Sequence, residues 1–259
     1  MLLRRTCMQF EQSEEIVGSR RAGFLFAMHY DIIDRKDDRA KKELYMSTYL
    51  FDFDGTLVDS MPVYAAMMLR ILEENNVPHD KDIIKVTTPL GYPKTAELFH
   101  DMGLDKPVEE IIAIMNERAV KAYTYDVEAK AHVIDALKRL KARGDSLNVL
   151  TASPHAMLDP CLKRLGVYDL FDHVWSCEDF GTTKADPQIY HMAAAKMGRP
   201  VDAIWFLDDN LGADRTAKAA GMRVCGVYDA SSAEYTQEIR EACDAYIEDF
   251  SQIDLLDRL

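Results

Sequence analysis

The chain has 259 residues, of which 48% are hydrophobic and 29% charged, and its formal net charge is −13. This composition is typical of a globular protein with one or two domains. The negative charge argues against non-specific binding to nucleic acid or to anionic membranes, because both require basic surfaces. No apolar run reaches the roughly 18 residues that a transmembrane helix requires. We therefore expect neither nucleic acid nor a membrane as a partner, and the oligomeric state stays open.

The cysteines and histidines show no spacing that is typical of a disulfide framework or a zinc site. The five cysteines are odd in number and form no CxxC pair, so we expect buried or free thiols in a reducing cytoplasm. The seven histidines show neither HxH nor HExxH spacing, which gives a histidine-rich zinc site little support. The predicted location of the protein is cytoplasmic.

Residues 1–45 differ from the rest of the chain. They hold nine Lys or Arg and eight Asp or Glu, a net charge of +1, which leaves −14 on the remainder. The interspersed acids, and an apolar stretch that covers only Phe24–Met28, argue against a signal peptide. We expect an N-terminal extension, loosely ordered or reflecting the choice of start site, before a working protein that begins near Met46. A short helical appendage is the alternative.

Short apolar runs alternate with helical stretches from Ser47 onward. The runs predict strands at Thr48–Phe53, Leu147–Leu150, His173–Ser176, Ala203–Leu207 and Arg223–Val227. Helical spacing predicts helices at Ala129–Ala142, His155–Leu165, Pro187–Met197 and Gly212–Ala220. This alternation predicts an α/β fold: a doubly wound parallel sheet with helices on both faces, whose ligands bind at the carboxyl ends of the strands.

Residues 61–127 interrupt the alternation, because they contain no convincing strand. Helical spacing is found instead at Pro62–Glu74, Lys94–Met102 and Val108–Tyr123. We interpret residues 61–127 as a helical cap domain, inserted into an α/β core that is formed by residues 46–60 and 128–259. An insertion at this point would lie over the carboxyl end of the sheet.

Two pairs of aspartates follow predicted strands. Asp52 and Asp54 lie in the stretch YLFDFDGTLVDS, and Asp208 and Asp209 follow AIWFL. Residues i and i+2 of a strand share a face, so the carboxylates of Asp52 and Asp54 are predicted to point the same way. Carboxylates held together repel each other unless a cation joins them, and Mg²⁺ prefers such oxygen ligands. The competing interpretation is that Asp52 and Asp54 only form a turn or cap a helix.

Four stretches, taken together and in order, resemble the motifs of the haloacid dehalogenase-like (HAD) superfamily. DFDGTLVDS is similar to the first motif, a DxDGT sequence after a strand, and LNVLTAS is similar to the second. TTKADPQIY is similar to the third motif, and AIWFLDDNLGADRTAKAAGM to the fourth. The resemblance covers about residues 47–228 and implies a Rossmann-like core. The helical insertion is similar to the cap of the phosphoglycolate phosphatase and β-phosphoglucomutase branch.

The resemblance implies a Mg²⁺-dependent phosphatase that works through an aspartyl-phosphate. Asp52 would be the nucleophile and a metal ligand, and Asp54 would be the general acid and base. The backbone carbonyl of Asp54 would also bind the metal, Gly55 would let the backbone approach, and Thr56 would hold Asp54. Dehalogenases of the superfamily lack the second aspartate, so Asp54 favours phosphoryl chemistry over halide displacement.

The other motifs imply phosphate and metal ligands. The Thr151 hydroxyl, the Ala152 backbone N–H and the Lys184 ammonium would bind the substrate phosphate. Taken singly, Thr151 could instead cap the following helix and Lys184 could be a solvated surface residue. Asp209 aligns with the usual metal ligand and Asp208 ranks second. The spacing departs from the family pattern at Ala213, so Asp214 stays open as a third possibility.

Three functions remain open at this stage. The first is a Mg²⁺-dependent phosphatase that hydrolyses a small phosphorylated metabolite. The second is a sugar phosphomutase, which uses the same residues, and the third is a catalytically silent binding or regulatory module. The natural substrate would be selected by the cap, where Thr87–Thr95 is the predicted specificity loop and an ordinary interhelical loop is the alternative.

Overall fold

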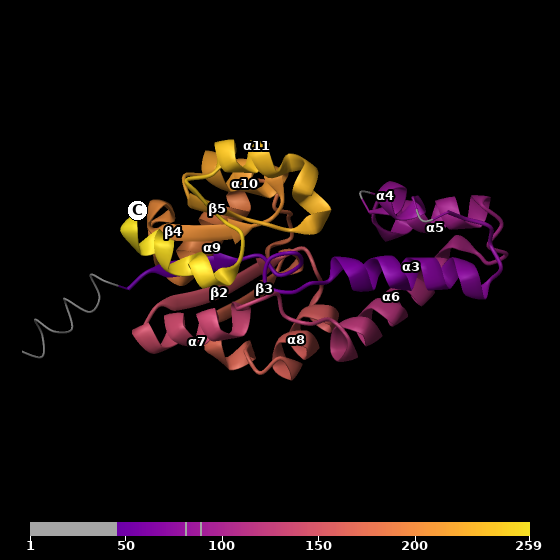
Figure 1. The fold of residues 1–259 in the computed structure, drawn as a ribbon, viewed down its shortest axis with the longest axis horizontal. Helices are drawn as coiled ribbons and strands as arrows, with labels where there is room; N and C mark the ends of the chain where they lie inside the picture. The colour runs from indigo at the N-terminus through magenta and orange to yellow at the C-terminus, as the bar shows by residue number, and fades with distance from the viewer. Residues whose placement is uncertain (1–45, 81, 89) are drawn as a thin grey trace, which may run out of the picture. The chain divides into compact units, whose positions relative to one another are not determined.

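The fold is described by a computed structural model that covers residues 46–80, 82–88 and 90–259. The predicted N-terminal extension, residues 1–45, lies outside this described part. A single six-stranded sheet has the order β3-β2-β1-β4-β5-β6, and every pair of neighbours is parallel (Figure 1). The predicted α/β fold is thereby confirmed. The strands are β1 Thr48–Phe51, β2 Ser146–Thr151, β3 His173–Ser176, β4 Ile204–Asp208, β5 Arg223–Val227 and β6 Ala245–Ile247.

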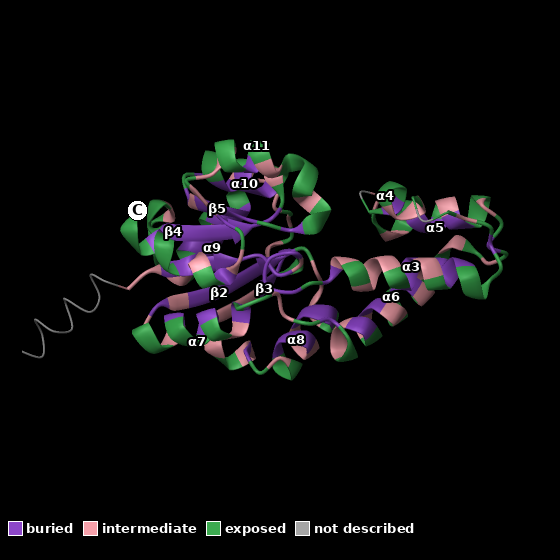
Figure 2. Cartoon of the chain, viewed as in Figure 1, coloured by how far each residue is buried: buried purple, intermediate pink, exposed green. Residues whose placement is uncertain are grey.

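Helices cover both faces of the sheet because successive strand residues point to opposite sides. Tyr49 and Phe51 of β1 belong to one buried cluster together with α7, α8 and the 3₁₀ helix η5. Leu50, between them, belongs to a second cluster together with α9 and α10. Figure 2 shows the strands as an almost continuously buried layer. The helices are α7 Val133–Arg143, α8 His155–Arg164, α9 Gln188–Met197, α10 Leu211–Ala219, α11 Thr236–Ala242 and η5 Phe250–Arg258.

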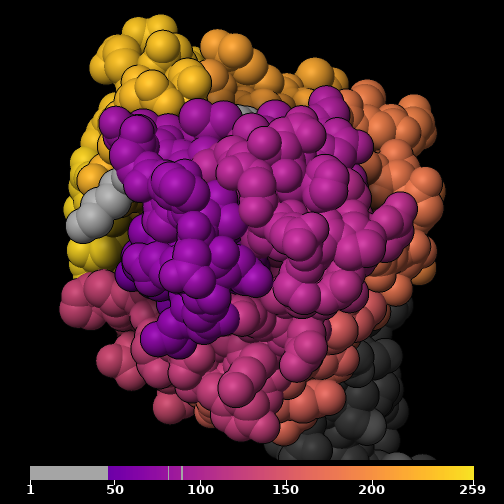
Figure 3. Space-filling model, turned by 90° about the vertical axis from the view of Figure 1, so that its right-hand side faces the viewer, coloured from indigo at the N-terminus to yellow at the C-terminus, as the bar shows by residue number. Residues whose placement is uncertain are grey.

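Four helices, α3 to α6, occupy the chain between β1 and α7 and have a buried cluster of their own. Met68, Phe99 and Met115 belong to it, and each is fully buried. Residues of this segment make up most of the face seen in Figure 3. The exact division into core and cap at residues 61 and 127 stays a prediction. The four helices are α3 Met61–Glu74, α4 Ile83–Thr87, α5 Gly91–Asp101 and α6 Val108–Tyr125.

The structure corrects three expectations. β1 ends at Phe51, two residues earlier than predicted, because Phe53 to Val58 form a turn in which the Gly55 N–H donates to the Val58 carbonyl at 3.0 Å. The predicted loop Thr87–Thr95 is mostly helical, since α4 ends at Thr87 and α5 begins at Gly91. β6 was not predicted at all, because Ala245–Ile247 is too short to form a recognisable apolar run.

Within the described ranges, none of the helices combines the length and the hydropathy needed to span a lipid bilayer. The largest buried side chains belong to the sheet, to its covering helices, to the turn after β1 and to the cluster of α3–α6. The predicted site aspartates follow or end β1 and β4, at the centre of the sheet, and Thr151 ends the neighbouring β2.

Candidate active site

The register of the sheet brings two acidic positions together. Phe51 of β1 is paired with Leu207 of β4, so the next residues, Asp52 and Asp208, leave the sheet side by side. The Asp52 backbone N–H donates to the Leu207 carbonyl at 2.8 Å, which continues the pairing by one residue. Parallel strands thus place Asp52, Asp208 and the following Asp209 at one edge of the sheet, as the sequence predicts.

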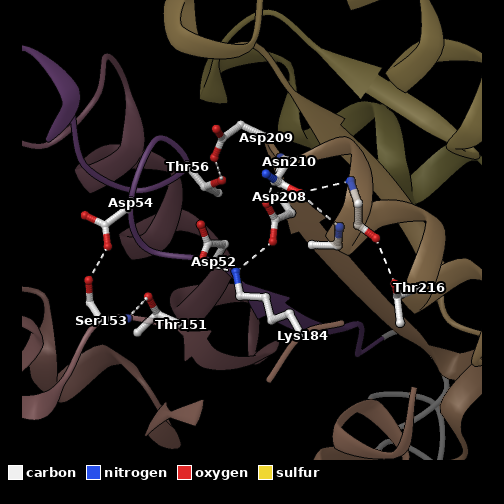
Figure 4. A network of polar contacts seen from close by, with 12 residues as sticks. Asp52, Asp54, Thr56, Thr151, Ser153, Lys184, Asp208, Asp209, Asn210 and Thr216 are labelled. Carbon is white, nitrogen blue, oxygen red and sulfur yellow. Dashed lines mark hydrogen bonds and ion pairs between the residues drawn. The ribbon is translucent and has the colours of Figure 1, made fainter. Parts of the chain in front are cut away.

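Asp52, Asp208 and Asp209 form a compact group of carboxylates. One oxygen from each lies within 4.8 Å of the others, and the residues are 6%, 0% and 8% exposed. Lys184 is the counter-charge: its Nζ donates to Asp52 Oδ1 and to Asp208 Oδ2, the latter at 2.8 Å (Figure 4). With all groups ionised, three negative charges face one positive charge, so two negative charges are uncompensated in a buried place.

Burial, together with the excess of negative charge, raises the pKa values of Asp52 and Asp209. Burial, together with the neighbouring charge of Asp208, raises the pKa of Asp52 to about 7, although Lys184 counteracts the shift. Burial and the charges of Asp208 and Asp52 also raise the pKa of Asp209 well above its ordinary value. Burial opposes the charged form of Lys184, but its two carboxylate partners nevertheless raise its pKa well above 10.5. Lys184 therefore stays a cation.

The three-carboxylate group fits a divalent cation. Its donors are oxygen atoms only, which suit a hard ion such as Mg²⁺ better than a soft metal. Two uncompensated charges match the charge of such an ion. Asp52 is more than a turn residue, because its carboxylate belongs to this group and binds Lys184. Lys184 is not a solvated surface lysine, because its side chain is only 13% exposed.

Gly55 and Thr56 hold Asp209 in place. Gly55 has φ +74°, and a Cβ atom there would lie 2.6 Å from both carboxylate oxygens of Asp209. Only glycine allows the two segments to approach this closely. The Thr56 hydroxyl donates to Asp209 Oδ1 at 3.1 Å. The prediction that Thr56 holds Asp54 is therefore wrong, because the turn points its hydroxyl toward β4.

The side chain of Asp54 does not join the three-carboxylate group. Its Oδ2 accepts from the Ser153 hydroxyl at 2.5 Å, and its Oδ1 accepts from the Tyr123 hydroxyl. Figure 4 shows the carboxylate facing Ser153, away from Lys184. The expectation that Asp52 and Asp54 point the same way is wrong, because β1 ends at Phe51 and Asp54 lies in the turn, where the strand periodicity no longer applies.

The predicted phosphate ligands lie at the end of β2. Thr151 is the last residue of the strand and is 1% exposed, and its hydroxyl oxygen accepts from the Ser153 N–H at 3.0 Å. The N-terminal cap position of α8 is Pro154, so Thr151 is not the cap of that helix. Ala152, which follows Thr151, is exposed at the same edge of the sheet.

Asp214 is buried but lies outside the three-carboxylate group. Neither of its carboxylate oxygens has a hydrogen-bond partner among the described residues. Burial and the charge of Asp208 raise its pKa to about 8. The nearby loop is instead ordered by Asn210, whose side chain accepts from the N–H groups of Gly212 and Ala213 and so caps α10.

Three contributors were not predicted. Tyr123 and Ser153 bind Asp54, and Lys130 donates to the Gly55 carbonyl at 2.5 Å and to Asp229 Oδ2 at 2.8 Å. Ser153 stands two residues after Thr151 in the second motif, where a third polar residue could have been noticed. Tyr123 and Lys130 carry no local signal, because their partners are more than 60 residues away in the chain.

The comparisons with known proteins agree with this geometry. Residues 49–227 match the family model described as haloacid dehalogenase-like hydrolase. The chain is 30% identical over 183 residues to a phosphoglycolate phosphatase of Cereibacter sphaeroides, which covers 69% of this chain and 83% of that protein. It is 28% identical over 183 residues to hexitol phosphatase B of Escherichia coli K12, covering 67% of this chain and 80% of that protein.

A similar fold occurs in a candidate β-phosphoglucomutase of Thermotoga maritima. That crystal structure superimposes with a TM-score of 0.72 at 20% sequence identity, covering 83% of this chain and all of the other. The predicted family and the predicted enzyme class, a hydrolase with phosphatases among its relatives, are thereby confirmed. The chain belongs to the haloacid dehalogenase-like hydrolase family.

Proposed function

We propose that the protein is a Mg²⁺-dependent phosphatase that hydrolyses a small phosphorylated metabolite through an aspartyl-phosphate on Asp52. One observation carries the proposal: the two aspartates of the first motif have separate surroundings. Asp52 lies in the three-carboxylate group beside Lys184, whereas Asp54 is held by two hydroxyl groups. Hydrolysis through a covalent intermediate needs these two roles, a nucleophile and a proton donor and acceptor. The names of the curated relatives support the same reaction class.

The residues that would hold Mg²⁺ are Asp52, Asp208 and Asp209, joined by the backbone carbonyl of Asp54. When bound, the ion supplies positive charge near the anionic phosphoryl group. Lys184 supplies a second positive charge from this chain, and it also reduces the repulsion between the Asp52 carboxylate and the incoming phosphate. The hydroxyl of Thr151 and the backbone N–H of Ala152 would orient the remaining phosphate oxygens.

In the first step a carboxylate oxygen of Asp52 attacks the phosphorus atom. The new O–P bond forms as the bond to the ester oxygen breaks, and the side chain of Asp54 gives its proton to the departing alcohol. In the second step the Asp54 carboxylate takes a proton from water, and the oxygen of that water attacks the phosphorus. The acyl-phosphate bond breaks, so that Asp52 is regenerated and inorganic phosphate is released.

We further propose that the segment α3–α6 acts as a cap over this site. α6 reaches the site through the Tyr123 hydroxyl, which donates to Asp54. Closing of such a segment over the substrate excludes water during the first step. The relatives named above act on phosphoglycolate and on hexitol phosphates, which are both small phosphate esters. A substrate of this size range is what we infer for this chain.

The decisive experiment measures phosphate release from p-nitrophenyl phosphate with and without Mg²⁺. Wild type is expected to be active only with Mg²⁺, and Asp52→Asn to be inactive under both conditions. Asp59→Asn is the matched control, since Asp59 is exposed and lies in the same segment of chain. Equal and negligible rates in every sample would favour the silent binding module instead.

A panel of phosphorylated metabolites then identifies the substrate. It should contain phosphoglycolate, hexose phosphates, hexitol phosphates and nucleoside monophosphates. Release of inorganic phosphate without a bisphosphate activator is the expected result. Isomerised sugar phosphate in place of free phosphate would contradict the proposal and indicate a phosphomutase.

A further inference from the structure

The carboxylate of Asp54 is held from two sides. The Ser153 hydroxyl, in the loop after β2, donates to Oδ2 at 2.5 Å, and the Tyr123 hydroxyl, in the last turn of α6, donates to Oδ1. The two donors come from different parts of the fold: Ser153 follows the sheet strand β2, and Tyr123 belongs to the helical segment α3–α6. A carboxyl group can accept more than two hydrogen bonds, so both contacts remain possible when Asp54 carries a proton.

Tyr123 lies where two hydrophobic clusters meet. Its ring packs against the cluster on the α7 face of the sheet and against the cluster of α3–α6. The ring centroid is 5.9 Å from that of Phe53, the residue directly before Asp54. Burial and the negative charge of Asp54 raise the pKa of Tyr123 above its ordinary value. The hydroxyl therefore keeps its proton and acts as the donor in this contact.

We propose that Tyr123 and Ser153 are positioning residues that fix the orientation of the Asp54 carboxylate for proton transfer. Asp54 needs such support because it follows the end of β1 and lies in a turn, where its backbone forms only an isolated bridge to Val58 and pairs with no neighbouring strand. Proton transfer depends on the distance and direction of the carboxyl oxygen, so a rotated side chain slows it. Since Tyr123 belongs to α6, the orientation of Asp54 depends on how α3–α6 packs. This inference rests on the proposed function.

The test compares two phosphate esters whose leaving groups differ in whether they must be protonated as they depart. An alkyl phosphate releases an alkoxide, which must be protonated, whereas p-nitrophenolate is a stable anion that leaves without a proton. Single-turnover rates with enzyme in excess isolate the first step. For Tyr123→Phe we expect the rate with an alkyl phosphate, chosen from the substrate panel, to fall by about tenfold, a part of the 10²–10⁴-fold that general acids contribute. The rate with p-nitrophenyl phosphate should fall much less, and KM for both esters should change little.

Ser153→Ala should show the same selective loss, and it carries the test if Tyr123→Phe fails to fold. The matched control is Tyr125→Phe, on the same helix, because Tyr125 is 66% exposed. This control should leave both rates unchanged. In an Asp54→Asn background, Tyr123→Phe should cause no further loss, because the residue acts only through Asp54.

Three results would overturn the inference. An equal loss for both esters would indicate a general structural role, and unchanged rates would indicate that the contact has no effect. A further loss in the Asp54→Asn background would show that Tyr123 acts independently of Asp54. These outcomes leave the proposed function intact as long as the wild type hydrolyses both esters and Asp54→Asn is impaired. A wild type that hydrolyses neither ester would refute the proposed function itself, and the inference with it.

Discussion

Replacing Gly55 with alanine tests whether the close approach of the first motif to Asp209 is essential. Gly55 has φ +74°, and the added Cβ would lie 2.6 Å from both oxygens of the Asp209 carboxylate and 2.7 Å from its Cγ. Ordinary Cβ contacts begin at about 3.4 Å. The added Cβ is attached directly to the backbone of the turn and cannot rotate away. The Asp209 carboxylate would therefore have to move by about 0.8 Å to restore an ordinary contact.

Two costs follow from Gly55→Ala, and they differ in kind. The left-handed backbone conformation costs about 1–2 kcal/mol of folding free energy for a residue with a Cβ atom. The displacement of Asp209 is larger than the roughly 0.2 Å by which metal–ligand distances usually vary, so Mg²⁺ binding is lost or strongly weakened. A misplacement near 1 Å costs about 10²-fold in rate. We expect Gly55→Ala to be folded, modestly destabilised and at least 10²-fold less active.

Gly166→Ala separates the two costs. Gly166 has φ +69°, and no atom lies within 4 Å of the position that its Cβ would take. It should therefore lose a similar amount of stability but keep its activity and its affinity for Mg²⁺. Urea unfolding, calorimetric titration with Mg²⁺ and kcat/KM for p-nitrophenyl phosphate measure the three quantities. Full activity in Gly55→Ala, or an equal loss of activity in both variants, would refute the reasoning.

Three further predictions concern charge. The folded-state pKa of Asp214, about 8, exceeds the unfolded value of 3.8, so the contribution of this group to stability is lost as the pH rises through this interval. The unfolding free energy of Asp214→Asn should therefore increase relative to that of wild type by about 1.4 kcal/mol per pH unit between pH 5 and 7. Urea unfolding of both proteins across this range measures the difference. Lys130→Met should lower the unfolding free energy by about 2 kcal/mol, because the Gly55 carbonyl and the buried Asp229 lose a charged donor, and an unchanged urea midpoint would contradict this. Mg²⁺ at 100 times its Kd should raise the unfolding free energy by about 2.7 kcal/mol. The affinity of the protein for Mg²⁺ should be weaker at pH 6 than at pH 8, because the pKa of Asp52 is about 7 and a metal ligand must be deprotonated. Calorimetric titration at both pH values checks this. In Asp209→Asn, Mg²⁺ should not raise the unfolding free energy.

The sequence was sufficient to predict where the acidic residues meet. Apolar runs that end in aspartates define strands, and parallel strands bring their carboxyl ends to one edge, so Asp52, Asp54, Asp208 and Asp209 were all expected together. The structure brings together three of them, and the side chain of Asp54 lies outside the group. Lys184 needed the motif order, since a lysine in a loop carries no local signal that it folds back into a buried site. The strand β6 was missed because three residues are too few for an apolar run, and the helical start at Gly91 was missed because glycine and proline in Gly91–Pro93 are typical of loops.

The contacts of Asp54 could not be predicted for a different reason. The period of two that governs a strand applied only as far as Phe51, and the sequence does not show where strand pairing stops and the turn begins. The partners of Asp54 come from α6 and from the loop after β2, at separations of 69 and 99 residues. Only the folded arrangement of the sheet and α3–α6 brings these hydroxyl groups to the same carboxylate.

The early end of β1 also accounts for the two different roles that we propose for two aspartates one residue apart. A carboxylate that binds a metal ion must be deprotonated, whereas a general acid must carry a proton at the start of the reaction. A continued strand would direct both side chains into the buried group beside Lys184, where each would be a metal ligand. Because the turn at Gly55 begins directly after the strand, Asp52 stays with Asp208, and Asp54 turns toward two hydroxyl groups. Under the proposed mechanism, the separation of nucleophile and acid is therefore a consequence of strand length, and we expect a variant that extends β1 by two residues to lose the proposed acid while it keeps the three-carboxylate group.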